Sequence, residues 1–515
     1  MVRIASRYLT SLLATLLVGW LVLAGSNAGA KADSVATQPA PNKTISTSSV
    51  GIQMFMWPWV SLTDECTSTL GPEGVDWILV SPPQEDIKGS QWWTHYQPVS
   101  YQLNSQLGTA DQFAAMVSAC NKAGVQVIVD AVINHMTNST GVGYAGTTFT
   151  KYNYPGLYSA TDFHSGLQAT DPNYCGSEIS NYNDAFQVVH CELGGLSDLA
   201  TEKLSVRATI AGYLNHLIDL GVAGFRIDAA KHIGITDLTA IRDLLHNVNG
   251  NPPYLLSESI GSADDNTPYT ALGDVFAWNY QTNITQVFSG LRTMAALPSG
   301  DKQVGPANNT VVMVSNHDTE HHGPSAVTYR DPKTYLAANA YLLATPVGKP
   351  MLYTGYAFSA FDTDAGPATS AGDTVAPAVC PSAALGNKPQ AKYPTGSFVC
   401  MQRWSAIKGM ISWRQQVADA PVSNSVNAGS LVAFKRGTGF FALNGSQPNS
   451  GDGIKKTVKT GLPKGNYCDV ITGGAVAVTG GKCLGTKIVV AANGTTKLNL
   501  PAMTVIAIDT QNKLN

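Results

Sequence analysis

Ionisable side chains stand at the ends of several short, β-branched runs in this 515-residue sequence. One run reaches Asp228, two positions after Arg226. Glu258 closes the next run, and Asp318 follows a later one. A single carboxylate in such a place is usually a helix cap or a solvated loop residue. Three carboxylates with an arginine on one face are much harder to explain as caps, so we interpret them as a reaction site.

Three carboxylates in one cleft suit the hydrolysis of glycosidic bonds. One carboxylic acid must protonate the leaving oxygen, while a second carboxylate acts at the anomeric carbon. When the two groups are roughly 5–5.5 Å apart, the second attacks directly and the anomeric configuration is retained. The guanidinium of Arg226 would keep a neighbouring Asp228 ionised, whereas the acid needs a desolvated place that raises its pKa.

Eight β-branched runs, most of them separated by helical patterns, must position these groups. The helical patterns are clearest over Gln112–Ala123 and Lys203–Leu220. Continuous apolar strands that alternate with helices predict a parallel sheet, and eight of them favour a closed TIM (β/α)8 barrel whose strand ends share one catalytic face. The runs are Gly51–Trp57, Val75–Pro83, Val125–His135, Val222–His232, Tyr254–Ser259, Asp274–Asn279, Val311–Asp318 and Met351–Tyr356.

Two stretches depart from this alternation. A long Gly/Tyr/Asn/Ser-rich segment follows the third run and is too long for a simple loop. Short β-type runs punctuated by Gly and Asn fill the C-terminal part, namely Leu431–Lys435, Gly439–Leu443, Lys487–Val490 and Thr504–Ile508. We therefore expect residues 50–135 and 199–420 to form the barrel, residues 136–198 an inserted subdomain after strand 3, and residues 421–515 a C-terminal antiparallel β-sandwich domain.

The N-terminus has the pattern of a secretion signal. Arg3 and Arg7 precede an apolar run from Tyr8 to Gly25, and small residues suited to cleavage follow. We expect residues 1–32 to be a signal peptide, residues 33–49 a Ser/Thr/Pro-rich stretch, and the product to be secreted and extracellular, with no membrane partner after cleavage. An uncleaved anchor is the alternative, because the run is near the minimum of roughly 17 residues for a span.

Composition excludes other classes of protein. Only 13% of residues are charged, the net charge is −3 and no basic block occurs, so a nucleic-acid partner is not expected. The eight cysteines are an even number, which suits an oxidising compartment, and none has the close spacing of a zinc site. Sequence alone leaves about 105 pairings of eight cysteines open.

Several segments together resemble the alpha-amylase family of glycoside hydrolases, in particular its animal-type and actinobacterial-type secreted members. The matching motifs run in the family's order along most of the chain from about Gly51. Four signature regions are matched by Asp130–His135, Gly224–His232, Glu258 and Asn316–Asp318, the motif near the end of the inserted domain by Leu196–Ala200, and the substrate-stacking segment by Trp92–Pro98.

The resemblance implies a role for each matching residue. Asp228 would be the nucleophile and Glu258 the general acid/base. Asp318 would bind sugar hydroxyls at the cleavage point and stabilise the transition state. Simple core packing is the alternative for the aromatic residues of the site. The substrate-binding residues would be Trp92, Trp93, Tyr96, Gln97, His135, Arg226, Lys231, His232 and His317.

A structural calcium ion between barrel and insertion is also implied. Asn134 and Asp198 would supply side-chain oxygens, and His232 and Val189 main-chain carbonyls. Oxygen donors of this kind suit Ca²⁺. A zinc site that uses His232 is the alternative, although no cysteine or carboxylate cluster accompanies it.

Chloride is not expected. Chloride-activated members of the family resemble this chain at Arg226 and Asn316, but Gly355 falls where their third, basic ligand would stand. By similarity we expect four disulfides, Cys66–Cys120, Cys175–Cys191, Cys380–Cys400 and Cys468–Cys483.

These observations lead to one main hypothesis and two alternatives. The main one is a secreted, monomeric, retaining endo-hydrolase of alpha-1,4 bonds in starch, glycogen and maltooligosaccharides. A related maltooligosaccharide-forming hydrolase or transglycosylase is the alternative within the enzymes. A catalytically silent, sugar-binding barrel is disfavoured, because Asp228, Glu258 and Asp318 are all present.

Overall fold

The computed structural model describes residues 37–261, 266–297, 309–322, 327–370, 373–381 and 392–514. The expected signal peptide, residues 1–32, lies outside these ranges, as do residues 33–36 of the stretch after it. Within the described ranges, no helix has both the length and the hydropathy needed to cross a bilayer.

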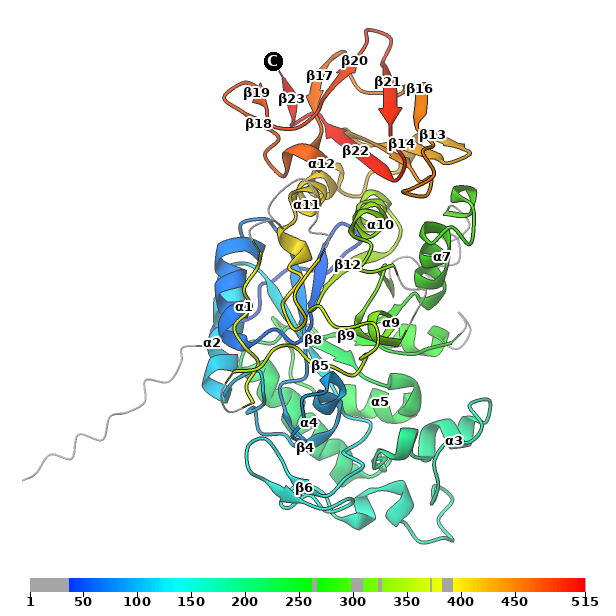
Figure 1. The fold of residues 1–515 in the computed structure, drawn as a ribbon. Coiled ribbons are helices and arrows are strands. Elements are labelled where there is room, and N and C mark those ends of the chain that lie inside the picture. The colour runs from blue at the N-terminus through cyan, green and yellow to red at the C-terminus, as the bar shows by residue number, and fades with distance from the viewer. Residues whose placement is uncertain are drawn as a thin grey trace, which may run out of the picture. The chain divides into compact units, whose positions relative to one another are not determined.

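Eight parallel strands close into a barrel (Figure 1). Each strand pairs with the next barrel strand along the chain, and the last pairs with the first. Every strand overlaps one of the eight predicted runs, so the TIM-barrel prediction is confirmed. The strands are β1 (Gly51–Met54), β2 (Trp77–Val80), β5 (Gln126–Ala131), β8 (Gly224–Ile227), β9 (Tyr254–Ser257), β10 (Asp274–Phe276), β11 (Thr310–Val312) and β12 (Lys349–Thr354).

Helices surround the barrel (Figure 1). The side chain of Thr109 accepts a hydrogen bond from the Gln112 N–H and so caps α2, whose Phe113, Met116 and Val117 are buried. The periodicity of both predicted helices therefore corresponds to a face packed on the barrel. The main helices are α1 (Trp59–Glu65), α2 (Ala110–Lys122), α4 (Leu204–Asp219), α5 (Ile235–Arg242), α7 (Trp278–Phe288), α10 (Pro332–Ala344) and α11 (Ser405–Val417).

The segment between β5 and α4 contains only short elements. Aromatic rings of this segment pack on one another and join the hydrophobic core of the barrel: Phe149 stacks on Tyr154, and Phe163 packs against Tyr154 and Tyr158. A side-chain cluster of this size can support a small inserted unit. Its elements are β6 (Gly141–Val142), β7 (Thr148–Phe149), η3 (Ala160–Asp162), η4 (His164–Gly166), α3 (Ala185–His190) and η5 (Leu193–Gly195).

The C-terminal part is built from antiparallel strands, as predicted. One sheet has the order β13 (Val422–Ala428), β14 (Leu431–Arg436), β15 (Gly439–Asn444), β22 (Thr504–Asp509). The other strand pairs are also antiparallel. They involve β16 (Ile454–Lys459), β17 (Gly465–Cys468), β18 (Val478–Thr479), β19 (Lys482–Cys483), β20 (Lys487–Val490), β21 (Thr495–Leu500) and β23 (Lys513–Leu514). A short helix, α12 (Val470–Gly473), follows β17.

Four disulfides join the eight cysteines in the pairs that the resemblance implied. They are Cys66–Cys120, Cys175–Cys191, Cys380–Cys400 and Cys468–Cys483. The first joins the end of α1 to α2, and the second closes the inserted segment. Disulfides of this kind stabilise a fold mainly by restricting the unfolded chain.

Candidate active site

One buried arginine binds three carboxylates at the carboxyl ends of the barrel strands. Arg226 on β8 is 1% exposed. Its Nη1 donates to Asp130 Oδ1 at 2.6 Å and to Asp228 Oδ1 at 2.7 Å. Its Nη2 lies 2.7 Å from Glu258 Oε1. Because Asp130 and Arg226 are partners in the β5–β8 register, the barrel itself fixes their approach.

The chain turns sharply after Asp228. Ala229 has a φ of 48°, in the left-handed region that a residue with a Cβ rarely adopts. Its N–H donates to Glu258 Oε2 at 2.9 Å, so this conformation helps to orient the second carboxylate. Strained backbone of this kind persists where the surroundings fix it, and it is concentrated at functional sites.

Asp318 enters the site from the start of α9 (His317–His322). Its Oδ2 lies 3.4 Å from His317 Nε2 and 3.3 Å from Asn316 Nδ2. Gln53 Nε2, 2.9 Å from His317 Nδ1, can only donate, so the imidazole carries its proton on Nε2, facing Asp318. Burial lowers the pKa of His317 well below its usual value, which keeps the ring neutral.

The acidic groups outnumber the cation that they share. Burial raises the pKa of Asp228 well above its usual value, against the charge of Arg226 and with a further contribution from Glu258. Burial also raises the pKa of Asp130 to about 6 and that of Asp318 in the same direction. Arg226 contacts three of these carboxylates and Asp318 is a fourth acidic group, so a single guanidinium faces an excess of carboxylates, and burial favours the protonated forms of Asp130, Asp228 and Asp318. We expected the charge of Arg226 to keep Asp228 ionised. Arg226 contacts three carboxylates, so its charge does not act on Asp228 alone.

The aromatic segment η2 (Trp92–Tyr96) lies against this cluster. The Tyr96 hydroxyl donates to Asp130 Oδ2 at 2.9 Å, and its ring stacks on His317 at 5.1 Å. Trp92 is only 4% exposed and packs edge-on against Tyr96 and His317, so it supports the site more than it lines it. Trp93 is half-buried and keeps more of its ring accessible.

Two further expected residues hold the loops around the site. His135 Nε2 donates to the Tyr96 carbonyl at 3.0 Å, and burial lowers the pKa of His135 to about 4. Gln97 Oε1 accepts from the Thr137 hydroxyl at 2.8 Å. Both side chains thus bond to other parts of the protein.

Lys231 and His232 lie just beyond Asp228 in η6 (Ala230–His232). Lys231 Nζ donates to the Ile260 carbonyl at 3.1 Å, on the loop that follows Glu258. His232 Nδ1 donates to the Val188 carbonyl at 2.8 Å, and burial lowers its pKa. His232 therefore links the barrel to α3 of the inserted segment.

The residues expected to bind calcium lie where the insertion meets the barrel. Asn134 Nδ2 is 3.3 Å from Asp198 Oδ1, and His164 Nδ1 is 2.6 Å from Asp198 Oδ2. Burial raises the pKa of Asp198 to about 7, a shift that a bound cation would oppose. Val189 follows the residue that His232 contacts. The donor set of one carboxylate, one amide and two carbonyls fits Ca²⁺. In the described ranges no cluster of three or more His, Cys, Asp or Glu is placed to hold a metal ion.

Two residues of the site carried no expected role. Asp130 belongs to a matched motif, but only the structure shows that it joins Tyr96 to Arg226. Gln53 orients His317 from β1 and is 3% exposed. Its sequence signal was a single polar residue between the apolar Ile52 and Met54.

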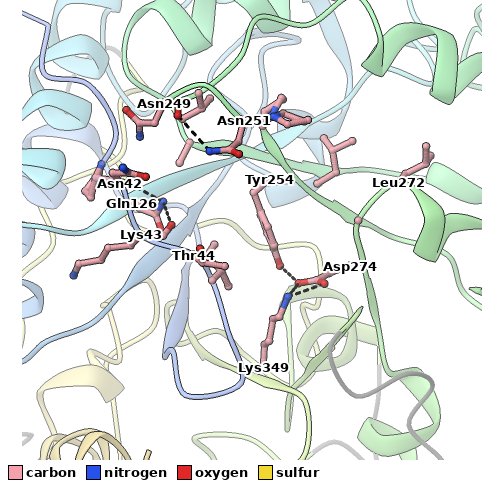
Figure 2. A pocket seen from close by; sticks show the side chains of 18 residues that line it. Asn42, Lys43, Thr44, Gln126, Asn249, Asn251, Tyr254, Leu272, Asp274 and Lys349 are labelled. Atoms are coloured by element: carbon pink, nitrogen blue, oxygen red, sulfur yellow. Dashed lines mark hydrogen bonds and ion pairs between the residues drawn. The ribbon is translucent and has the colours of Figure 1, made fainter. Parts of the chain in front are cut away.

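A separate cavity of about 400 Å³ lies at the opposite end of the strands (Figure 2). Tyr254, Asp274 and Lys349, the first residues of β9, β10 and β12, contribute to its wall. Lys349 Nζ is 2.7 Å from Asp274 Oδ2, which also accepts from the Tyr254 hydroxyl at 2.6 Å. Since its one carboxylate is already neutralised, this cavity lacks the acid pair that glycoside hydrolysis needs.

Comparison with known proteins agrees with the geometry. Residues 74–259 match the alpha amylase catalytic domain and residues 422–511 the alpha amylase C-terminal all-beta domain. An alpha-amylase of Thermomonospora curvata is 38% identical over 96% of this chain and 79% of its own length. One from Tenebrio molitor is 36% identical over 87% of this chain and 94% of its own.

A solved structure extends the likeness to the fold. It is a substituted form of alpha-amylase I from Eisenia fetida in complex with maltohexaose. The TM-score is 0.80 at 31% identity, over 92% of this chain and 99% of that one. Sequence, fold and the grouping of carboxylates at the strand ends agree, and the chain belongs to the alpha-amylase family of glycoside hydrolases.

Proposed function

We propose that the protein is a secreted endo-hydrolase that cleaves alpha-1,4-glucosidic bonds in starch, glycogen and maltooligosaccharides with retention of configuration. The observation that carries the proposal is the contact of one buried guanidinium, that of Arg226, with Asp130, Asp228 and Glu258. The alpha-amylases among the relatives and the maltohexaose bound to the Eisenia fetida protein support the substrate class.

In the first step Asp228 attacks the anomeric carbon while Glu258 gives its proton to the glycosidic oxygen. The covalent bond to Asp228 forms as the bond to the leaving chain breaks. Both carboxylates bind adjacent nitrogens of the same guanidinium, which favours the short separation that direct attack requires.

In the second step Glu258, now ionised, takes a proton from water, and the oxygen of that water attacks the same carbon. The bond to Asp228 breaks and the carboxylate is restored. Asp318 would accept hydrogen bonds from sugar hydroxyls, with His317 Nε2 fixing its orientation. Two successive inversions give net retention.

Calcium would be held by Asn134, Asp198 and the carbonyls of Val189 and His232. Its charge would fix the insertion against the strand end that precedes the active site. Chloride would not be required, because Gly355 stands where chloride-activated members of the family have their third, basic ligand. Four disulfides support secretion, and we propose that the mature chain, with the domain limits given above, works as a monomer.

The test is product analysis on soluble starch with calcium present, using wild type and Asp228→Asn side by side. We expect mixed maltooligosaccharides from the wild type and almost none from Asp228→Asn. Asp243→Asn is the matched control, because that side chain is 61% exposed and remote from the cluster. A single short product would favour the maltooligosaccharide-forming alternative. A wild type without hydrolysis would contradict the proposal.

A further inference from the structure

A fully buried acid–imidazole pair lies beneath the aromatic segment of the active site. His95 Nδ1 is 2.6 Å from Asp86 Oδ2, and both side chains are 0% exposed. Removing two polar, ionisable groups from water is costly, and such a buried pair often stabilises a fold no more than apolar residues of similar volume. A contribution to positioning would account for the pair better than stability alone.

The pair is connected to three parts of the fold. Asp86 ends β3 (Glu85–Asp86), which pairs with β4 (Pro98–Ser100). Its carbonyl accepts from the Tyr144 N–H of the insertion at 3.0 Å. The carbonyl of His95 accepts from Gln84 Nε2 at 3.0 Å, and Gln84 is in turn bonded by a hydroxyl of α4. The backbone at His95 is thus fixed from several sides, and the ring contact with Asp86 completes the arrangement.

His95 directly precedes Tyr96, whose hydroxyl donates to Asp130. Asp130 in turn binds Arg226, which holds Asp228. The 3-10 helix from Trp92 to Tyr96 is only five residues long. Hydrogen bonds in such a helix have poorer geometry than in an α-helix, so side-chain anchors contribute to where it lies. A displacement of about 1 Å at a reaction site can cost about 10²-fold in rate.

We propose that Asp86 and His95 are positioning residues for the hydrolysis, an inference that rests on the proposed function. Neither side chain is accessible to substrate. Together they hold Tyr96 against Asp130 and His317, and this contact aligns Arg226 with the nucleophile.

The molecule supplies its own control. The Asp274–Lys349 pair at the other end of the strands is also buried, with side chains 4% and 9% exposed, and has a similar distance of 2.7 Å (Figure 2). It makes no contact with the carboxylates around Arg226 in the described ranges. Asp274→Asn therefore disrupts a buried polar pair of similar separation without touching the active site.

The experiment compares Asp86→Asn with Asp274→Asn by melting temperature and by initial rates on maltoheptaose. We expect both substitutions to lower the melting temperature. Only Asp86→Asn should lower kcat, by about 10-fold or more, with a smaller change in KM, because the charged groups at the cleavage point are displaced while outer sugar contacts remain. Equal kcat losses in the two variants would overturn the proposal.

A double variant separates positioning from packing. Asp86→Val with His95→Leu replaces the pair by apolar side chains, which should restore much of the melting temperature. The positioning role predicts that kcat stays low, and recovery of kcat to the wild-type level would overturn it. If the wild type itself proves inactive on alpha-glucans, the proposed function fails. A crystal structure of the double variant then tests the positioning role separately. If Tyr96 keeps its contact with Asp130, the positioning role is overturned. If Tyr96 is displaced from Asp130, the positioning role is supported.

Discussion

Glu258 and Asp228, which both contact Arg226, have different proposed roles in the reaction. Glu258→Gln removes the acid that protonates the leaving oxygen and is expected to lower kcat by about 10²–10⁴-fold. Asp228→Asn removes the nucleophile and should cost at least as much. Initial rates on soluble starch measure both, with Asp243→Asn as the control. Turnover near the wild-type rate in either variant would refute the assignment.

Glu320, buried two residues after Asp318, gives a pH-dependent prediction. Burial raises its pKa from 4.5 to about 8, against the opposing effects of Arg330 and the Tyr353 hydroxyl. Between these values the folded chain keeps a proton that the unfolded chain releases, so the free energy of unfolding falls as pH rises from 4.5 to about 8. Glu320→Gln has no proton to lose and should be relatively more stable than wild type at the upper end of this window.

Melting temperatures of wild type and Glu320→Gln across this window test the prediction. The difference between them should be small near the lower limit and should grow as pH rises. A difference that is independent of pH would show that Glu320 is charged throughout, or that its burial costs nothing.

At the residue scale, the sequence predicted that the carboxylates lie at one face of the barrel, but it did not predict which groups they contact. The spacing of strand ends brings Asp228 and Glu258 to one face whatever the side-chain geometry. How many carboxylates share Arg226 depends on rotamers and burial, which no spacing encodes. The role of Gln53 was not predictable, because a single polar residue in an apolar strand has many explanations.

Among the elements, those with a strong burial pattern were predictable. All four residues of β2 are buried and apolar, and the six buried residues of β5 include the apolar run Val127–Val129 between Gln126 and Asp130. β13 and β16 are mostly exposed and rich in Ser, Asn, Lys and Thr, so their pairing was not predicted. The 3-10 path of η2 depends on contacts with distant segments, such as the Trp92 indole N–H to the Thr363 carbonyl at 3.0 Å.

The C-terminal end of α10 gives a prediction at the element scale. Nη1 of the buried Arg414 on α11 donates to the carbonyls of Leu343 and Thr345 at 2.8 and 2.7 Å. Arg414→Met leaves both carbonyls without this partner, at a cost of about 1–3 kcal/mol each. We expect a clearly lower melting temperature with unchanged kcat.

Arg242→Met serves as the control for this substitution, since Arg242 pairs with an exposed carboxylate and such pairs contribute about 0–1 kcal/mol. Calorimetry or thermal melts followed by circular dichroism measure the effect. Equal stability of the two variants would contradict the account of how α10 ends.

On the scale of the whole molecule, the barrel and the disulfide pairs followed from sequence, the first from alternation of elements and the second from family resemblance. The contacts between the insertion and the barrel did not follow from the sequence. They include those of Asn134 with Asp198 and of His232 with Val188, which join segments far apart in the chain. Three of the residues that make these contacts, Asn134, Asp198 and His232, are also proposed calcium ligands.

Chelation tests the calcium proposal. Excess EDTA should lower the melting temperature by several degrees, because an ion that binds only the folded chain stabilises it by mass action. Added Ca²⁺ should restore it, and Asp198→Asn should weaken the response to both. A melting temperature unaffected by EDTA would count against a structural ion.

The most direct test of the central claim is the anomeric configuration of the first products, followed by proton NMR immediately after the enzyme meets maltoheptaose. A nucleophilic Asp228 and two successive displacements predict new reducing ends that appear first as the alpha anomer and mutarotate only later. New reducing ends that appear first as the beta anomer would mean a single displacement by water, and would contradict the assignment of Asp228 as nucleophile.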